Sequence, residues 1–186
     1  MPKTFHYPDT NFSCQLVSHR CEATTRANMQ CKRRAVIGSS PHLCWNHLLK
    51  LKHLRIAPSL MPNAGKGLFA LDPSREEGFI LFRPKQLIIT YGGEHIDQRE
   101  LNNRYGEGTA PYAVEVSKRR GLYEDGGCHR GIGANVNTYT RHQNARLGIG
   151  QGGATKLYAT KIIRNGDEIY VSYGRGYHGF ADHYTR

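Results

Sequence analysis

Asn165-Gly166-Asp167-Glu168-Ile169-Tyr170-Val171-Ser172-Tyr173-Gly174 is the stretch of this 186-residue chain that decides its fold. The Asn-Gly dipeptide at its start is typical of a tight turn. The β-branched and aromatic residues that follow predict a strand, and the strand ends in Tyr-Gly. The stretch therefore predicts a turn and then a strand, with a tyrosine and a second turn residue at the end of the strand.

The chain before this stretch has the same character as far back as residue 54. Short apolar runs alternate with turns rich in Gly, Pro and Asn, and no unit of about 20–50 residues repeats, which excludes solenoids and propellers. Residues 97–105 predict a helix, because Asp97 is a favourable N-cap and Gly106 follows the last helical residue. The fold class expected is mostly β, with one or two short helices. Predicted strands cover residues 54–56, 67–71, 79–82, 87–91, 112–116, 157–159 and 168–172.

Three further signatures precede the first in a fixed order. Asn63-Ala64-Gly65-Lys66-Gly67-Leu68-Phe69-Ala70 predicts a glycine-flanked turn that enters a strand. Thr90-Tyr91-Gly92-Gly93-Glu94-His95-Ile96 lies between a predicted strand and the helix. Gly133-Ala134-Asn135-Val136-Asn137, with the nearby Asn144-Ala145-Arg146-Leu147, forms an asparagine-rich segment. Each signature alone is a common pattern, whereas their order along the chain is more specific.

In this order the four signatures resemble the SET domain of protein lysine methyltransferases, whose usual patterns read G-x-G-L-F-A, Y-x-G-E, N-H-S…P-N-A and G-E-E-I-x-x-x-Y-G. The resemblance covers roughly residues 55–177 and points to a minimal SET protein, of a kind that also occurs in large DNA viruses. It implies a β-clip-like fold of small sheets with a knot-like crossover, the cofactor S-adenosylmethionine, and methyl transfer to a lysine amine. Catalysis of such an in-line displacement consists largely of positioning the two reactants.

The resemblance also implies roles for individual residues. The implied catalytic residues are Tyr173 and Tyr91. The implied cofactor-binding residues are Lys66, Gly67, Leu68, Asn135 and Tyr173. Tyr112 and Tyr177 are expected to line the substrate lysine channel, and a tyrosine at position 177 favours the addition of fewer methyl groups.

The sequence departs from the family pattern in two places. Val136 stands where the family has histidine, which bears on the adenine side of the cofactor pocket. Many members close the site with a C-terminal zinc cluster, but no cysteine follows Cys128, so the aromatic residues of segment 177–184 are expected to cover the site. Cys128 itself is interpreted as a structural thiol.

Four of the five cysteines lie in the first 44 residues. An odd number of cysteines without a secretory signal favours reduced thiols or metal ligands over disulfides. The spacing Cys21-x9-Cys31-x12-Cys44-x2-His47 suits the tetrahedral Cys3His shell of structural zinc, with Cys14 and His19 as alternatives for one ligand. The pattern resembles small zinc-binding modules that read C-x-A-x-T…C-x-R…C-x-x-H.

We therefore expect a basic zinc-binding module in residues 1–53 and a SET methyltransferase domain in residues 54–186. The net charge of +11 is concentrated at the front, since residues 1–60 hold nine Lys and Arg against two Asp and Glu. Basic residues within segment 20–55 are expected to contact DNA or the nucleosome. A basic histone tail requires acidic groups in its groove, for which the candidates are Glu94, Glu115, Glu124 and Asp125.

Apolar runs in the chain are too short to span a membrane, and the N-terminal residues do not resemble a signal peptide, so we expect no membrane partner. The expected location is intracellular, at chromatin in the nucleus, or in a host nucleus or virion for a viral protein. Three functions remain open. They are a histone lysine methyltransferase, a zinc protein that binds nucleic acid or chromatin and whose SET-like domain is weak or inactive, and a methyltransferase of a non-histone protein.

Overall fold

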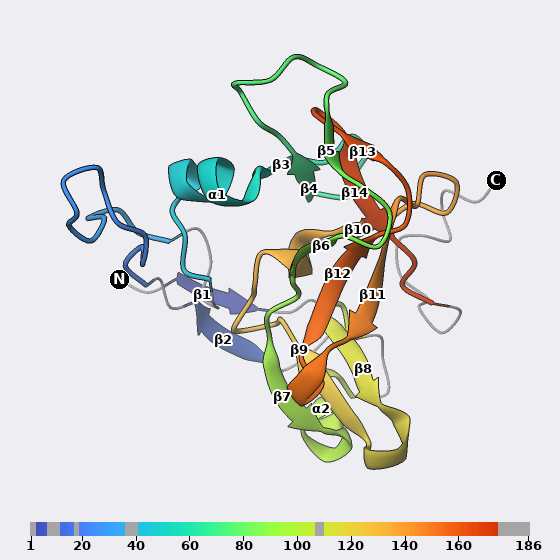
Figure 1. The fold of residues 1–186 in the computed structure, drawn as a ribbon. Coiled ribbons are helices and arrows are strands. Elements are labelled where there is room, and N and C mark those ends of the chain that lie inside the picture. The colour runs from blue at the N-terminus through green and yellow to red at the C-terminus, as the bar shows by residue number, and fades with distance from the viewer. Residues whose placement is uncertain (1–2, 7–11, 17–18, 36–40, 107–109, 175–186) are drawn as a thin grey trace.

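The computed structural model describes residues 3–6, 12–16, 19–35, 41–106 and 110–174. Within these residues, short strands form small sheets, accompanied by two short α-helices (Figure 1). No helix in the described part of the chain is long and apolar enough to cross a membrane. The α-helices are α1 (Trp45–Lys52) and α2 (Gln98–Tyr105).

The described strands form five sheets, in each of which the strands named one after another are hydrogen-bonded neighbours. The two-stranded sheets are β1 (Lys3–His6) with β2 (Ser13–Leu16), and β13 (Ile163–Arg164) with β5 (Ile80–Phe82). The three-stranded sheets are β11 (Ala145–Ile149), β12 (Thr155–Ala159) and β6 (Leu87–Thr90), and β7 (Glu94–Asp97), β9 (Leu122–Asp125) and β8 (Ala113–Ser117). The four-stranded sheet is β10 (Asn137–Thr138), β14 (Glu168–Val171), β4 (Lys66–Ala70) and β3 (Leu54–Pro58).

The predicted elements are confirmed. The seven predicted strands correspond to β3, β4, β5, β6, β8, β12 and β14, with ends that differ by one or two residues. The predicted helix is α2, in which the Asp97 carboxylate accepts a hydrogen bond from the Glu100 N–H at 2.8 Å. Sequence patterns do not predict β9, because two of its four residues are the buried acids Glu124 and Asp125. The segment therefore contains no apolar run of the kind that indicates a strand.

β14, which carries the opening stretch, lies between two segments that are distant in sequence (Figure 1). It pairs in parallel with β10, where Asn137 is opposite Tyr170, and antiparallel with β4. All four of its residues are buried. The turn before it is fixed by Asn165, whose amide donates to three carbonyl oxygens in segment 72–76 at 2.9–3.1 Å. This arrangement brings the residues that follow β14 beside the asparagine-rich segment.

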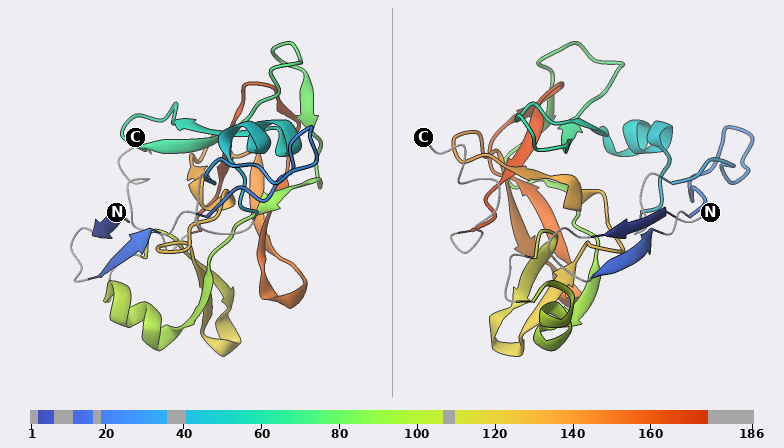
Figure 2. Two further views of the ribbon diagram at one scale, coloured as in Figure 1. Left: turned by 90° about the vertical axis from the view of Figure 1, so that its left-hand side faces the viewer. Right: turned by 180° about the vertical axis from the view of Figure 1, so that it is seen from behind.

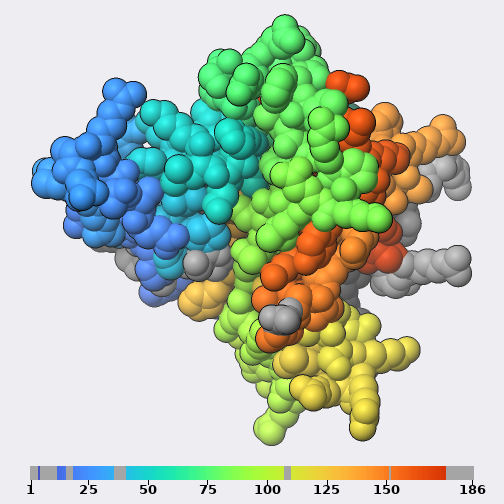
Figure 3. Space-filling model, in the orientation of Figure 1, coloured from blue at the N-terminus to red at the C-terminus, as the bar shows by residue number. Residues whose placement is uncertain are grey.

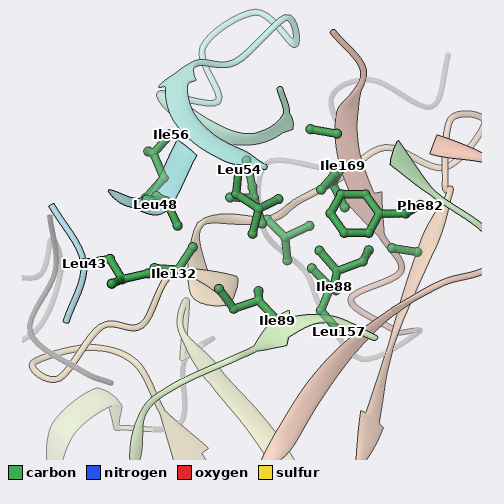
Figure 4. Close-up of a cluster of buried hydrophobic side chains, with 14 of the residues drawn as sticks. Leu43, Leu48, Leu54, Ile56, Phe82, Ile88, Ile89, Ile132, Leu157 and Ile169 are labelled. Atoms are coloured by element: carbon green, nitrogen blue, oxygen red, sulfur yellow. The ribbon is translucent and has the colours of Figure 1, made fainter. Parts of the chain in front are cut away.

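One hydrophobic cluster extends through both parts of the chain (Figure 4). Leu43 and Leu48, from the cysteine-bearing segment, belong to the same cluster as Leu54, Ile56 and Ile132. In the space-filling view the cysteine-bearing segment forms a lobe at the left of the molecule (Figure 3). The proposed boundary after residue 53 therefore separates two parts that differ in sequence and charge but share a core.

A buried ionic network holds α2 against β7 and β9 at one end of the molecule (Figure 2). Asp125 is fully buried and accepts hydrogen bonds from Arg104 Nη1 at 2.8 Å and from the Tyr105 hydroxyl at 2.9 Å. Arg104 also donates to Glu94 at 2.6 Å. Phe12, just before β2, packs edge-on against the Tyr105 ring at 5.5 Å between centroids. The network thus connects the N-terminal hairpin to this end of the molecule.

Cys14 in β2 forms a disulfide with Cys128, which lies 114 residues later in the chain. This finding corrects the expectation of reduced thiols outside the zinc cluster, and with it the roles of Cys14 as an alternative zinc ligand and of Cys128 as a structural thiol. Spacing in a sequence cannot reveal such a pair, because only tertiary packing brings the two cysteines together.

Removal of this disulfide is expected to lower stability markedly. The bond closes a loop of 114 residues. A cross-link over a loop of that size lowers the conformational entropy of the unfolded chain, which stabilises the folded state by about 4–5 kcal/mol. The Cys14→Ser variant should therefore melt at least about 10 °C below the oxidised wild type, since 1 kcal/mol corresponds to roughly 2–4 °C at this chain length. A phosphine reductant should lower the melting temperature of the wild type to that of the variant and leave the variant unchanged. Equal melting temperatures of oxidised wild type and variant would contradict the prediction.

Candidate active site and metal centre

Three cysteines and one histidine from the N-terminal segment converge at one point. Cys21, Cys31 and Cys44 are buried, and their sulfur atoms lie with the His47 ring nitrogen within 4.8 Å of one another. His47 Nδ1 is 3.3 Å from the Sγ atoms of both Cys21 and Cys44. These separations fit a tetrahedral shell in which zinc lies about 2.0–2.3 Å from each ligand atom. The four predicted residues therefore form a Cys3His cluster that could hold zinc.

The local chain explains how this cluster forms. Antiparallel bridges close the segment that carries the first two cysteines. Cys44 is the N-cap of α1, so His47 lies in the first turn of the helix and faces the same point. The ring of His19, the alternative ligand, lies instead against the ring of His42, with centroids 4.2 Å apart.

The pKa values of two thiols in the cluster are shifted in opposite directions. A hydrogen bond from the main-chain N–H of Arg33 lowers the pKa of the Cys31 thiol. Burial raises the pKa of the Cys44 thiol. Zinc binds thiolates, so a bound ion would favour the charged form of both groups.

Tyr173 lies two residues after the end of β14, and its hydroxyl donates a hydrogen bond to the main-chain carbonyl oxygen of Val136 at 2.6 Å. The Val136 side chain is only 2% exposed and belongs to the hydrophobic cluster. The residue that replaces the family histidine thus contributes its backbone to the tyrosine and its side chain to the core. Because the phenol uses its one O–H in this bond, its oxygen can act toward a ligand as an acceptor.

Tyr91 follows β6, and its hydroxyl donates to the main-chain carbonyl oxygen of Tyr112 at 2.8 Å. Burial, together with the nearby Tyr173 and the carboxylates of Asp125 and Glu124, raises the pKa of Tyr91 well above its usual value. The phenol is therefore protonated at neutral pH. The Tyr112 ring lies under the guanidinium group of Arg130, 3.6 Å from it.

Tyr91 and Tyr173 line the same cavity, which has a volume of about 120 Å³. Apart from Glu115, the other lining residues have apolar side chains; they are Ala110, Pro111, Ala113, Val114, Ala134, Val136 and Leu147. The structure thus brings the two implied catalytic tyrosines together. Tyr112, an implied channel residue, is not among the residues that line this cavity, whereas its neighbours Pro111 and Ala113 are.

The four acidic residues expected around a basic peptide differ from one another in position and in hydrogen-bond partners. Of the four candidates, Glu115 lines the cavity of the two tyrosines in the described part of the chain. Glu94 and Asp125 both bond to Arg104. Glu124 is buried and accepts a main-chain N–H at 2.6 Å. Three of the four expected groups therefore already have hydrogen-bond partners within the fold, and two of them share the positive charge of Arg104.

The residues implied in cofactor binding form the start of β4. Leu68 is fully buried, whereas the Lys66 side chain is exposed. Gly67 has no room for a side chain, because a Cβ atom there would overlap the Oε1 atom of Glu168. Gly65, just before the strand, has φ of +69° and open space around it. The main chain of this strand and the Lys66 ammonium group are therefore the parts that can reach a ligand.

Asn135 ends the short 3-10 helix η2 (Gly133–Asn135), which packs against β4. Its amide nitrogen donates to the carbonyl oxygens of Gly131 at 2.9 Å and Ile132 at 3.2 Å. The N–H groups of the amide thus stabilise the turn that contains Asn135, and they do not point toward a ligand site. Tyr177, the second implied channel residue, lies outside the described residues.

Sequence reasoning missed two polar residues at this site. Asn137 donates to the carbonyl oxygen of Lys66 at 3.0 Å and to Glu168 at 3.2 Å. Glu168 is 3% exposed and lies in the otherwise apolar or aromatic strand β14. A carboxylate within such a strand is a signal that could have drawn attention to it, because buried charges require specific partners.

Comparison with solved structures identifies chains of similar fold. A chain of the Chaetomium thermophilum polycomb repressive complex 2 (PRC2) is similar with a TM-score of 0.58 and 23% identity, over 69% of this chain and 16% of that chain. An active PRC2 in the stimulated state gives a TM-score of 0.58 and 23% identity, over 75% of this chain and 18% of that chain. A ctPRC2 structure bound to S-adenosylmethionine gives a TM-score of 0.55 and 24% identity, over 66% and 15% of the two chains.

No family model and no curated protein matches the chain. The chain spans less than a fifth of the length of the solved chains that it matches. At this level of identity the likeness shows a common fold. The mostly β fold of small sheets that the SET resemblance implied is thereby confirmed, together with the Cys3His cluster that precedes it.

Proposed function

We propose that this protein belongs to the minimal SET type and is an S-adenosylmethionine-dependent protein lysine N-methyltransferase that acts on histone. The observation that carries the proposal is the pair formed by Tyr91 and Tyr173, whose hydroxyl groups both bond to main-chain carbonyls at one small apolar cavity. The fold shared with PRC2 chains, including one in a structure bound to S-adenosylmethionine, supports it.

The two tyrosines act as hydrogen-bond acceptors toward the substrate amine. Each phenol has a single O–H, and in each that O–H donates to the backbone, so the oxygen presents only lone pairs to the cavity. An amine N–H can donate to such an oxygen, which orients the nitrogen lone pair for attack. A polarised methyl group can also make weak C–H···O contacts with it.

The apolar wall supplies the second part of the mechanism. A lysine amine must be neutral to attack, and desolvation among apolar side chains lowers the pKa of an amine. The raised pKa of Tyr91 makes this phenol unsuitable as a base at neutral pH. The site therefore works by desolvation and orientation, and the lysine ammonium group releases its proton to solvent water before the transfer.

S-adenosylmethionine, when bound, supplies the methyl group on a positively charged sulfur. The residues at the start of β4 fit the amino-acid end of this cofactor. The exposed Lys66 ammonium group can pair with its carboxylate, and the open space beside Gly65 leaves the main chain accessible. Asn135 belongs to the short 3-10 helix η2 that packs against β4, and its side-chain carbonyl oxygen is a hydrogen-bond acceptor.

A basic peptide is the substrate class that the cavity favours. Glu115 lies at the cavity on β8 and can pair with a positive charge close to the target lysine. A further ctPRC2 structure, with 24% identity and a TM-score of 0.55, is in complex with H3K27me3 and H3K27M. This likeness supports histone over other proteins as the substrate class.

The zinc-binding part, residues 1–53, docks the SET domain, residues 54–186, onto chromatin in the nucleus. Its exposed basic side chains can neutralise DNA phosphates. Zinc in the Cys3His cluster holds these groups in a fixed arrangement. The exposed basic residues of segment 20–55, of which the last lies just beyond this part, are Arg20, Arg26, Lys32, Arg33, Arg34, Lys50, Lys52 and Arg55.

Methyl transfer from labelled S-adenosylmethionine to core histones and to nucleosomes tests the function. We expect incorporation into a histone lysine, identified by mass spectrometry, and faster incorporation into nucleosomes at low salt than at high salt, because phosphate contacts weaken as salt rises. Calorimetry should detect cofactor binding. No cofactor binding at high micromolar concentrations would contradict the proposal and favour a zinc protein that only binds chromatin. Cofactor binding without histone methylation would instead favour a non-histone substrate.

A further inference from the structure

The start of β4 is held in place by a side chain from another segment. The Asn137 amide nitrogen donates to the main-chain carbonyl oxygen of Lys66 at 3.0 Å and to Glu168 Oε1 at 3.2 Å. Asn137 begins β10, and these two bonds reach across β14 to the strand that β14 pairs with on its other side. One amide group therefore joins three segments that are far apart in the sequence.

The acceptor of the second bond is a buried carboxylate whose two oxygens are both occupied. Glu168 Oε1 accepts from the Ser59 hydroxyl at 2.7 Å, in addition to the bond from Asn137. Its Oε2 accepts from the Leu60 N–H and from the Tyr170 hydroxyl, both at 2.7 Å. A buried charge with this many hydrogen bonds has a defined position, because any movement would break several of them at once.

These contacts fix both ends of the turn that leads into the strand. The N–H of Ser59 donates to the carbonyl oxygen of Gly65 at 2.9 Å, which closes the turn. Glu168 holds its first residues, and Asn137 holds Lys66 directly after it. Gly67 completes the arrangement, since a Cβ atom there would overlap Glu168 Oε1 and lie 3.3 Å from Asn137 Nδ2. The backbone at residues 65–67 therefore has one conformation with respect to β14.

We infer that Asn137, supported by Glu168, is a positioning residue that orients the main chain of Lys66 and Gly67 for the cofactor. The inference rests on the proposed function, because it assigns to Asn137 an effect on the binding of S-adenosylmethionine. Asn137 acts through the carbonyl oxygen of Lys66. Its two amide hydrogens have protein partners, which makes a ligand role for these hydrogens unnecessary.

Two variants and a matched control test this role in the full-length, zinc-loaded protein. Asn137→Ala removes the amide, and Asn137→Asp keeps its shape but removes both N–H groups and adds a charge beside Glu168. Asn144→Ala is the control. Asn144 bonds to β14 as well, donating to the Glu168 carbonyl oxygen at 2.9 Å and accepting from the Tyr170 N–H at 2.9 Å, but it does not bond to Lys66.

Two readouts distinguish positioning from general stability. Calorimetry should give a dissociation constant for S-adenosylmethionine about 3–10-fold higher for Asn137→Ala, the range expected for one lost hydrogen bond, and a larger increase for Asn137→Asp. Hydrogen exchange of the peptide that contains residues 66–70, measured without cofactor, should accelerate by a similar factor. Asn144→Ala should melt at a lower temperature than the wild type but keep the wild-type dissociation constant and exchange rate in that peptide.

The outcomes separate this inference from the proposed function. A wild type that binds the cofactor, combined with unchanged affinity and exchange in Asn137→Ala, would overturn the positioning role alone. Equal losses in Asn137→Ala and Asn144→Ala would overturn it too, because they would reflect only the stability of β14. A wild type that does not bind S-adenosylmethionine contradicts the proposed function and, with it, the role of Asn137 in cofactor binding.

Discussion

The Tyr173→Phe variant is expected to transfer methyl groups about 100–1,000-fold more slowly than the wild type. Loss of one oriented hydrogen-bonding group at a reacting centre has an effect of this size. Phenylalanine keeps the ring but removes the oxygen that accepts from the amine, and it also removes the bond to the Val136 carbonyl oxygen that fixes the ring. Single-turnover methylation of histones with saturating cofactor measures this rate directly.

A tyrosine outside the cavity provides the control for this substitution. Tyr158 lies in β12, with the guanidinium group of Arg146 5.1 Å from its ring centroid. It is not among the described residues that line the cavity of Tyr91 and Tyr173. Tyr158→Phe should therefore retain the wild-type rate. If Tyr173→Phe and Tyr158→Phe were equally active, the assigned role of Tyr173 would be wrong.

Removal of Cys44, a proposed zinc ligand, is expected to destabilise the whole protein. Structural zinc in small modules contributes about 10 kcal/mol or more of folding free energy at neutral pH. Leu43 and Leu48 lie on either side of Cys44 and belong to the hydrophobic cluster shared by both parts of the chain. If the Cys3His cluster loses its order, these two leucines leave that core and become exposed. Cys44→Ser should therefore lower the melting temperature by at least about 20 °C, at roughly 2–4 °C per kcal/mol.

Metal analysis makes this second prediction specific. The wild type should contain one zinc ion per chain, and a strong chelator should reproduce the lower melting temperature of Cys44→Ser. The Cys14→Ser variant loses the disulfide and should keep its zinc, since Cys14 is outside the Cys3His cluster. If the wild type melts at the same temperature before and after a chelator has removed its zinc, the Cys3His cluster is not a structural metal centre.

Local patterns in the sequence were sufficient for the elements whose formation depends on neighbouring residues. α2 was predictable because Asp97 and Gly106 mark its two ends. β14 was predictable because a turn and an apolar run are adjacent in the chain. The Cys3His cluster was predictable for the same reason, since Cys44 and His47 lie within one helical turn of each other.

Contacts between distant segments were not predictable in this way. The Cys14–Cys128 disulfide depends on how the N-terminal hairpin packs, which cysteine spacing does not determine. The role of Asp125 was not predictable either. A sequence does not distinguish an acidic residue that faces a substrate from one that is buried and paired with Arg104. Only the packed structure shows which charges are already neutralised.

The hydrogen bond from Tyr173 to the backbone of Val136 bears on how this chain can diverge in evolution. Every amino acid provides the same main-chain carbonyl, so position 136 can change its side chain while the tyrosine keeps its orientation. Selection at this position then concerns volume and hydrophobicity in the core. A motif search that requires histidine at position 136 would miss this protein. The hydrogen bond that orients Tyr173 nevertheless persists, because a substitution at position 136 does not remove the main-chain carbonyl.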